Sequence, residues 1–401
     1  MMNPRLDLLA DYPFDRLRAL LDGLPPPKEL ETLVLSVGEP RHSPSPLVHE
    51  VIAANSGLWG RYPPIDGTPE FRLAVTDWLN RRYALPDGLV DAHKHVLPVA
   101  GTREALYLIA SVAIAERRAG SRPAVLMPNP FYQVYYGAAV MSGAEPCYLA
   151  ATPETGHLPD LTQLDDAALE RTAIMYLCSP ANPQGAAADG GYLENAIRLA
   201  RRFDFVLVVD ECYGDIYDRQ PPCGALQACA AMSDGSGGED MANVLVFHSL
   251  SKRSSVPGLR SGFVAGDPRL ISAFRRVRSF GGASVPLPVL AASAALWKDT
   301  DYPEHNRALY REKFDAAEAI LANRFGFYRP EGGFFLWLDV GNGEEAAKKL
   351  WAEGALRVLP GAYLAKSDAF GANPGANYIR MALIDDLPST QEALRRLDKI
   401  L

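Results

Sequence analysis

The middle of the chain alternates short apolar runs with amphipathic helical stretches, and this pattern constrains the fold most strongly. Amphipathic stretches such as Tyr192–Phe203 (YLENAIRLARRF) separate the runs, and another predicted helix starts at Arg103 (REALYLIASVAIAERR) after Gly101-Thr102. Regular alternation of this kind predicts a parallel sheet covered by helices, which is an α/β fold. The apolar runs are Ala124–Met127, Ile174–Leu177, Phe205–Val209, Val244–Phe247 and Gly262–Ala265.

The pattern changes after about residue 290. A long helical stretch, YPEHNRALYREKFDAAEAILANRF, precedes two runs typical of strands, FFLWLDV and YIRMAL. The chain has 401 residues, which exceeds what one hydrophobic core usually supports. We therefore expect a large domain over residues 46–289 with the mostly parallel central sheet. A smaller α+β domain is expected from residues 1–45, which include an N-terminal arm, and residues 290–401.

Composition excludes several classes of protein. The net charge of -8 argues against a nucleic-acid surface. No apolar stretch approaches the ~20 residues that span a bilayer, and the acidic residues Asp7, Asp11 and Asp15 interrupt the N-terminus, unlike a secretory signal. With an odd number of cysteines, five, we expect free thiols and a cytoplasmic protein. The stretch SDGSGGED at Ser233–Asp240 predicts an exposed loop.

Polar residues follow the apolar runs at the edge where ligands bind in open α/β sheets. Each has an ordinary explanation alone: a helix cap, a turn, a solvated lysine or a surface ion pair. Together they supply an amine, a carboxylate, an amide, hydroxyls, aromatic rings and an arginine, which is the set that pyridoxal phosphate (PLP) requires. These residues are Gly101, Thr102 and Arg103; Phe131 and Tyr132; Asn182; Asp210 and Tyr213; Ser249, Ser251 and Lys252; and Arg260.

Four motifs resemble those of the class I/II aminotransferases, the aspartate aminotransferase superfamily of PLP fold type I. The segment from Ser249 through Lys252 to Gly262 resembles the family's cofactor-lysine signature. Ser-Pro-Ala-Asn182-Pro-Gln-Gly is similar to its Asn-Pro-x-Gly turn, and Asp210-Glu-Cys-Tyr213 to its Asp-Glu-x-Tyr motif. Tyr62 followed by Gly-Thr-Pro-Glu-Phe-Arg72 resembles a fourth family element.

The resemblance implies a catalytic role for three residues. Lys252 would carry PLP as a Schiff base and then act as general base and acid at the substrate α-carbon. Asp210 would face the pyridine nitrogen and favour its protonated form. Asn182 and Tyr213 would bind the phenolic oxygen. Tyr132 would stack on the ring, with Phe131 as the alternative.

The resemblance also implies how the anionic groups are bound. Backbone N–H groups of Gly101, Thr102 and Arg103 would bind the phosphate at a helix N-terminus. Side chains of Ser249, Ser251 and Arg260 would complete that site. Tyr62 would reach the phosphate from a partner subunit, which predicts a homodimer with shared active sites. Arg380 would grip the substrate α-carboxylate, Gly38 would lie at the substrate mouth, and no metal site is expected.

The substrate is less constrained by the motifs. Overall, the chain is similar to bacterial N-succinyl-diaminopimelate aminotransferases of lysine biosynthesis, which implies glutamate as donor and N-succinyl-2-amino-6-oxopimelate as acceptor. Such a substrate needs a second basic residue, for which Arg41, Arg103 and Arg278 are all candidates. Alternatives are an aspartate, aromatic or broad-specificity aminotransferase and a β-eliminating C–S lyase. A transcriptional regulator is disfavoured because the fold's own motifs begin by Gly38.

Overall fold

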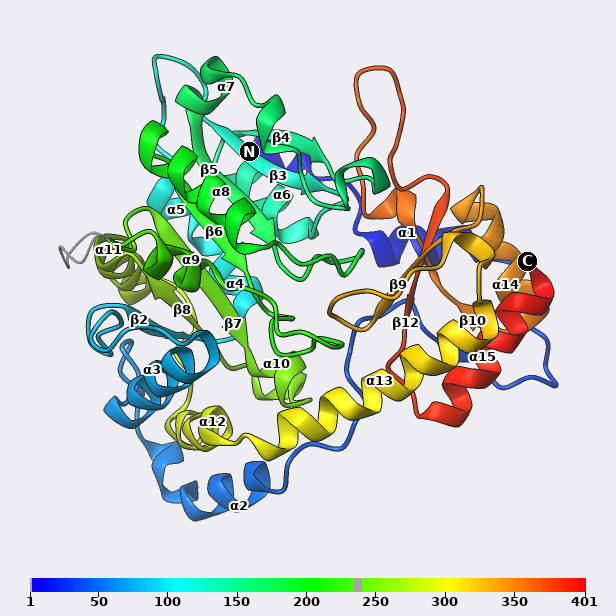
Figure 1. The fold of residues 1–401 in the computed structure, drawn as a ribbon, viewed down its shortest axis with the longest axis horizontal. Helices are drawn as coiled ribbons and strands as arrows, with labels where there is room; N and C mark the ends of the chain where they lie inside the picture. The colour runs from blue at the N-terminus through cyan, green and yellow to red at the C-terminus, as the bar shows by residue number, and fades with distance from the viewer. Residues whose placement is uncertain (1, 234–239) are drawn as a thin grey trace.

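The computed structural model describes residues 2–233 and 240–401, so most of the loop expected at Ser233–Asp240 lies outside the described residues. A seven-stranded sheet forms the centre of the fold (Figure 1). Four of its pairings are parallel, whereas β8 pairs antiparallel with both neighbours. Across the sheet the strands are β2 (Val96–Val99), β8 (Gly262–Gly266), β7 (Val244–Ser249), β6 (Val206–Asp210), β5 (Thr172–Cys178), β3 (Ala124–Asn129) and β4 (Glu145–Ala150). The predicted α/β fold with a mostly parallel sheet is confirmed.

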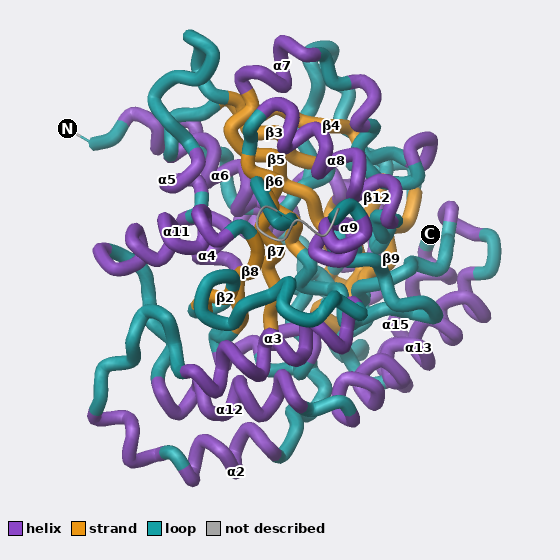
Figure 2. Tube along the Cα trace, turned by 60° about the vertical axis from the view of Figure 1, so that its left-hand side comes forward, coloured by secondary structure: helices purple, strands orange, loops and turns teal. Residues whose placement is uncertain are grey.

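Helices cover both faces of this sheet, which is why its inner strands are apolar on both sides. Every residue of β3, β5, β6, β7 and β8 is buried. On one face pack α4 (Thr102–Leu108), α6 (Gln133–Met141) and α11 (Pro268–Phe280). On the other face pack α3 (Pro69–Tyr83), α8 (Gly190–Phe203), α9 (Ala225–Ala231) and α12 (Leu287–Lys298). Figure 2 shows α2 (Leu47–Ala54) beside α12, which in turn packs on α3.

The helix predicted from Arg103 is shorter than its pattern suggests. It ends at Leu108, and a separate short helix, α5, covers only Ala110–Ala113. The basic end of the run leaves the helical path, where Arg118 forms a turn with Ser121. Its guanidinium then donates to the carbonyls of Phe203 and Asp204 at the end of α8, both at 2.6 Å. Arg118 thus bonds to the end of α8 and does not continue the helix predicted from Arg103.

A second, antiparallel sheet of three strands forms beyond residue 330, in the order β11 (Leu359–Pro360), β12 (Tyr378–Ala382), β9 (Phe335–Asp339). The two predicted strands are confirmed as β9 and β12. α14 (Gly343–Gly354) and α15 (Leu387–Ile400) contribute to its core, and α13 (Asp301–Leu321) runs toward it from α12 (Figure 1). Within the described residues, no helix is both long and apolar enough to cross a membrane.

The N-terminal segment contacts helix α6 of the large sheet's layer and also the three-stranded sheet. A 3-10 turn, Pro4–Leu8, lies on α6, where Arg5 Nη1 donates to the Met141 carbonyl at 3.0 Å. α1 (Pro13–Leu20) instead packs Leu17 among side chains of the three-stranded sheet, including Trp337. Tyr12, the residue before α1, therefore lies between the two attachments.

Candidate active site

A cavity of about 710 Å³ opens beyond the carboxyl ends of the central strands, between the seven-stranded sheet and β9 and β12 of the three-stranded sheet. Sequence reasoning placed most of its polar lining there. The cavity is lined by Gly38, Thr102, Arg103, Phe131, Tyr132, Asn182, Asp210, Tyr213, Ser249, Ser251, Lys252, Arg260 and Arg380. Gly101 lies directly beside Arg260. Tyr62 is fully exposed and is not among the lining residues of this single chain.

Lys252 lies on α10 (Leu250–Arg253), the short helix that follows β7. Its Nζ donates to the Gly38 carbonyl at 2.5 Å, so the loop after β1 (Leu33–Val34) meets the lysine in the cavity. Burial, with a smaller effect of the positive charges of Arg380 and Arg103, lowers the pKa of Lys252 to about 8. A neutral, nucleophilic amine is therefore accessible close to physiological pH.

Asp210 ends β6 and is buried at the floor of the cavity. Its Oδ2 accepts a hydrogen bond from the Tyr135 hydroxyl at 2.8 Å, and its Oδ1 accepts from the Cys212 backbone N–H at 3.2 Å. Burial raises the pKa of Asp210, so a cation facing the carboxylate would stabilise its ionised form. Tyr135 is itself fixed by stacking on Tyr176, with ring centroids 4.6 Å apart. Sequence reasoning missed Tyr135 because it precedes Asp210 by 75 residues.

Arg380 is a buried arginine that no carboxylate neutralises. It lies on β12, is 5% exposed, and forms no ion pair with any described acidic residue. Nη1 donates to Asn182 Oδ1 at 3.0 Å and Nη2 to the Ser36 carbonyl at 2.7 Å, whereas Nε has no partner. The guanidinium lies over Phe335, 4.3 Å from its centroid. Burial lowers its pKa to about 10, and a carboxylate in the cavity would compensate that loss of solvation.

Arg260 and the start of α4 form a second positive region. Arg260 has a left-handed backbone, with φ of 53°, and its guanidinium lies against Gly101. A Cβ at Gly101 would lie 2.0 Å from Arg260 Nη2, and the φ of 83° also favours glycine. Ser249 caps α10 by accepting from the Ser251 N–H at 3.1 Å. Donors from three strand ends thus converge where an anion can be held.

Aromatic residues line the remaining walls. Phe131 is buried and packs on Tyr148, with centroids 5.4 Å apart. Tyr132 is less enclosed, and its hydroxyl accepts from Arg103 Nε at 2.9 Å. The Tyr213 ring packs edge-on against Phe334 at 5.5 Å between centroids. Both Phe131 and Tyr132 contact the cavity, but Tyr132 has the freer ring face.

Of the three basic residues proposed for a distal substrate group, the structure places one in the cavity. Arg103 lines it. Arg278 is buried elsewhere and donates to the Pro98 and Ala283 carbonyls, at 2.5 and 2.8 Å. Arg41 pairs with Asp385 outside the cavity lining. Arg41 and Arg278 therefore do not line this cavity, and both side chains have partners elsewhere.

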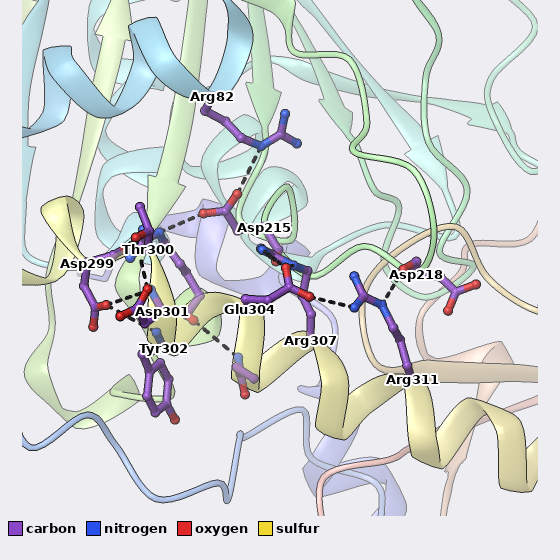
Figure 3. Close-up of polar contacts among 12 residues, drawn as sticks. Arg82, Asp215, Asp218, Asp299, Thr300, Asp301, Tyr302, Glu304, Arg307 and Arg311 are labelled. Atoms are coloured by element: carbon purple, nitrogen blue, oxygen red, sulfur yellow. Dashed lines mark hydrogen bonds and ion pairs between the residues drawn. The ribbon is translucent and has the colours of Figure 1, made fainter.

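A buried ion-pair network supports α10 from behind, and sequence reasoning missed it. Asp215 accepts from Arg253 Nε at 2.7 Å and from Arg82 Nε at 3.1 Å. Arg307 of α13 donates to the Asp215 carbonyl at 3.2 Å and pairs with Glu304 at 2.6 Å (Figure 3). Since Arg253 follows Lys252 directly, this network fixes the helix that presents the lysine.

Comparison with known proteins identifies relatives along the whole chain. The family model for aminotransferase class I and II matches residues 31–384. A solved aminotransferase structure from Neisseria meningitidis Z2491 superposes with a TM-score of 0.93 and is 37% identical over 99% of each chain. The LL-diaminopimelate aminotransferase of Syntrophobacter fumaroxidans is 29% identical, covering 99% of this chain and 98% of its own. The 4-dedimethylamino-4-oxo-anhydrotetracycline transaminase OxyQ of Streptomyces rimosus is 30% identical, covering 93% and 95%.

Proposed function

Because this chain belongs to the class I and II aminotransferases, a PLP-dependent family, we propose that it moves an amino group between glutamate and a diaminopimelate-type keto acid. The acceptor we favour is N-succinyl-2-amino-6-oxopimelate, on the overall sequence likeness described above. Relatives named as LL-diaminopimelate aminotransferases support a diaminopimelate-type substrate. The single observation that carries the proposal is Arg380, buried without a carboxylate in the cavity that also holds Lys252.

The residues of the cavity fit PLP. Arg260 with the start of α4 suits the phosphate, Asp210 suits the ring nitrogen, and Tyr132 offers a face for the ring. When bound, PLP supplies an aldehyde that condenses with amines and a ring that accepts electrons from the substrate α-carbon. Tyr135 donates to Asp210 at 2.8 Å and would hold its carboxylate in place for that ring. Ser249, Ser251 and Thr102 would complete the phosphate site.

Lys252 is the group that would move the proton. Its amine is neutral at a pH above its pKa of about 8, so Nζ would be able to take up and give back a proton at the substrate α-carbon. In the chain without cofactor, the Gly38 carbonyl lies 2.5 Å from Nζ and holds the amine in the cavity. Tyr213 lies beside it, with Nζ 6.0 Å from its ring centroid, and would bind the phenolic oxygen together with Asn182.

Arg380 would orient the substrate by its α-carboxylate. A planar guanidinium binds a carboxylate through two parallel hydrogen bonds, and this fixes the α-carbon relative to Lys252. Asn182 and the Ser36 carbonyl hold the guanidinium from its other edges, at 3.0 and 2.7 Å. The cavity would thus bind the α-carboxylate of an α-amino acid regardless of its side chain.

The active unit in this proposal is a homodimer. The side chain of Tyr62 is fully exposed to solvent, which is unusual for a large aromatic residue. Trp59 and Leu73, from the same part of the chain, are also exposed, at 54% and 52%. A partner copy would cover this surface, and its Tyr62 would complete the phosphate site of the first chain.

A turnover assay tests the proposal. The PLP-loaded enzyme is given 2-oxoglutarate with N-succinyl-diaminopimelate, LL-diaminopimelate, aspartate or phenylalanine, and glutamate is measured. Glutamate formation that is fastest with the succinylated compound supports the favoured substrate, and a preference for LL-diaminopimelate corrects it. Cystathionine, whose β-sulfur can leave as a thiol, is tested separately without any keto acid, and release of pyruvate and ammonia from it would instead indicate a β-eliminating lyase.

A further inference from the structure

The cavity contains one more unneutralised arginine than an α-amino acid and PLP require. Three arginines line it, Arg103, Arg260 and Arg380, and none forms an ion pair with a carboxylate of the described residues. In the proposed function, Arg260 meets the cofactor phosphate and Arg380 meets the α-carboxylate. The positive charge of Arg103 then has no counter-charge and could pair with a third anionic group in the cavity.

We infer that Arg103, assisted by Tyr12, forms a subsite for a second carboxylate on the substrate side chain. The inference rests on the proposed function and deepens it by naming the class of substrate, an acidic amino acid or keto acid. It also assigns the residue that reads the acidic end.

The geometry of Arg103 suits such a role. It lies in the first turn of α4, and its Nε donates to the Tyr132 hydroxyl at 2.9 Å. Its Nη2 donates to the Tyr12 hydroxyl at 3.4 Å, whereas Nη1 has no hydrogen-bond acceptor among residues 2–233 and 240–401. The two tyrosines hold the guanidinium but do not neutralise it. One edge remains available for an oxygen from the cavity.

Tyr12 supplies a second donor at the same place. Its hydroxyl accepts from Arg103, and its own proton donates to no described acceptor, so it is available to a carboxylate oxygen. Tyr12 and Phe14 both line the cavity, with ring centroids 5.6 Å apart. α1 keeps them there, because the guanidinium of Arg16 lies 3.8 Å from the centroid of the Tyr363 ring.

The carboxylates around the cavity do not satisfy Arg103 in place of a ligand. Glu104 also lines the cavity, and its Oε1 accepts from the Ala283 N–H at 2.7 Å. Glu39 lies on the loop beside Gly38, and neither carboxylate forms an ion pair with Arg103. A dicarboxylic ligand could therefore place one carboxylate at Arg380 and the other at Arg103, whereas a neutral side chain would leave Arg103 unpaired.

The test compares ligand binding in the PLP-loaded enzyme with no turnover. Wild type, Arg103→Gln and Arg41→Gln are titrated calorimetrically with glutarate, which has two carboxylates, and with butyrate, which has one. Arg103→Gln should weaken glutarate binding about 10- to 100-fold, as expected for loss of a charged hydrogen bond, and change butyrate binding less than about twofold. Arg41→Gln removes the same charge outside the cavity and should preserve the preference for glutarate.

Two results would overturn the inference. One is an equal loss of glutarate and butyrate binding in Arg103→Gln; the other is a weaker affinity for PLP itself, measured by cofactor fluorescence, which would assign Arg103 to the phosphate. A loss of the glutarate preference in Arg41→Gln would also reject it. Failure of the proposed function has a different signature, because a wild-type enzyme that produces no glutamate could still prefer glutarate.

Discussion

The titration of Lys252 in the apoenzyme gives a quantitative test of the site. Burial together with the charges of Arg380 and Arg103 lowers its pKa from 10.5 to about 8. At pH 7 an amine with a pKa near 8 is neutral in about one molecule in ten, compared with about one in 3,000 for an ordinary lysine. The folded site therefore raises the concentration of reactive amine by about 300-fold.

Reductive methylation with ¹³C-formaldehyde, followed by NMR at pH 6 to 11, would measure this pKa. Burial also lowers the pKa of Lys313 to about 8, so the resonance of Lys252 must be assigned by its loss in Lys252→Arg. Arg380→Gln removes a positive charge and should raise the pKa of Lys252. A Lys252 resonance that titrates near 10.5, or a lower pKa in Arg380→Gln, would show that burial and the neighbouring arginines do not lower the pKa of this lysine.

Two further predictions concern the supports of the site. Asp215→Ala leaves the buried Arg253 without its carboxylate and should reduce the free energy of unfolding by about 3–5 kcal/mol, whereas the exposed pair of Asp398 should contribute at most about 1 kcal/mol in a matched Asp398→Ala control. Denaturant unfolding monitored by circular dichroism measures both, and equal losses would contradict the assignment. Gly101→Ala places a Cβ against Arg260 and should weaken PLP binding measured by fluorescence, while leaving secondary structure intact; unchanged affinity would show that Gly101 does not shape the phosphate site.

Much of the site was predictable because a parallel sheet brings strand ends together. The carboxyl ends of β5, β6 and β7 fall at one edge of the sheet whatever the loop lengths, so Asn182, Asp210 and Lys252 could be placed near one another. Their side-chain chemistry then pointed to PLP, and membership of the family confirms that cofactor.

Contacts between distant segments could not be predicted in the same way. Tyr135 faces Asp210 through the packing of α6 on the sheet, and its sequence pattern gives only a helix. The loop of Ser36 reaches Arg380 across 344 residues, which no periodicity encodes. The choice of Arg103 over Arg278 likewise depended on which guanidinium already had carbonyl partners, a property of packing alone.

A single half-reaction with PLP-loaded enzyme and no keto acid tests whether Lys252 and its cofactor transfer the amino group. The visible absorbance band of the lysine-bound cofactor is followed after N-succinyl-diaminopimelate, aspartate or phenylalanine is added, with Lys252→Ala as the control. We expect selective loss of the band with the succinylated substrate in wild type and no amino transfer in Lys252→Ala. A wild-type protein that binds no PLP, or a Lys252→Ala variant that transfers the amino group at the wild-type rate, would contradict it.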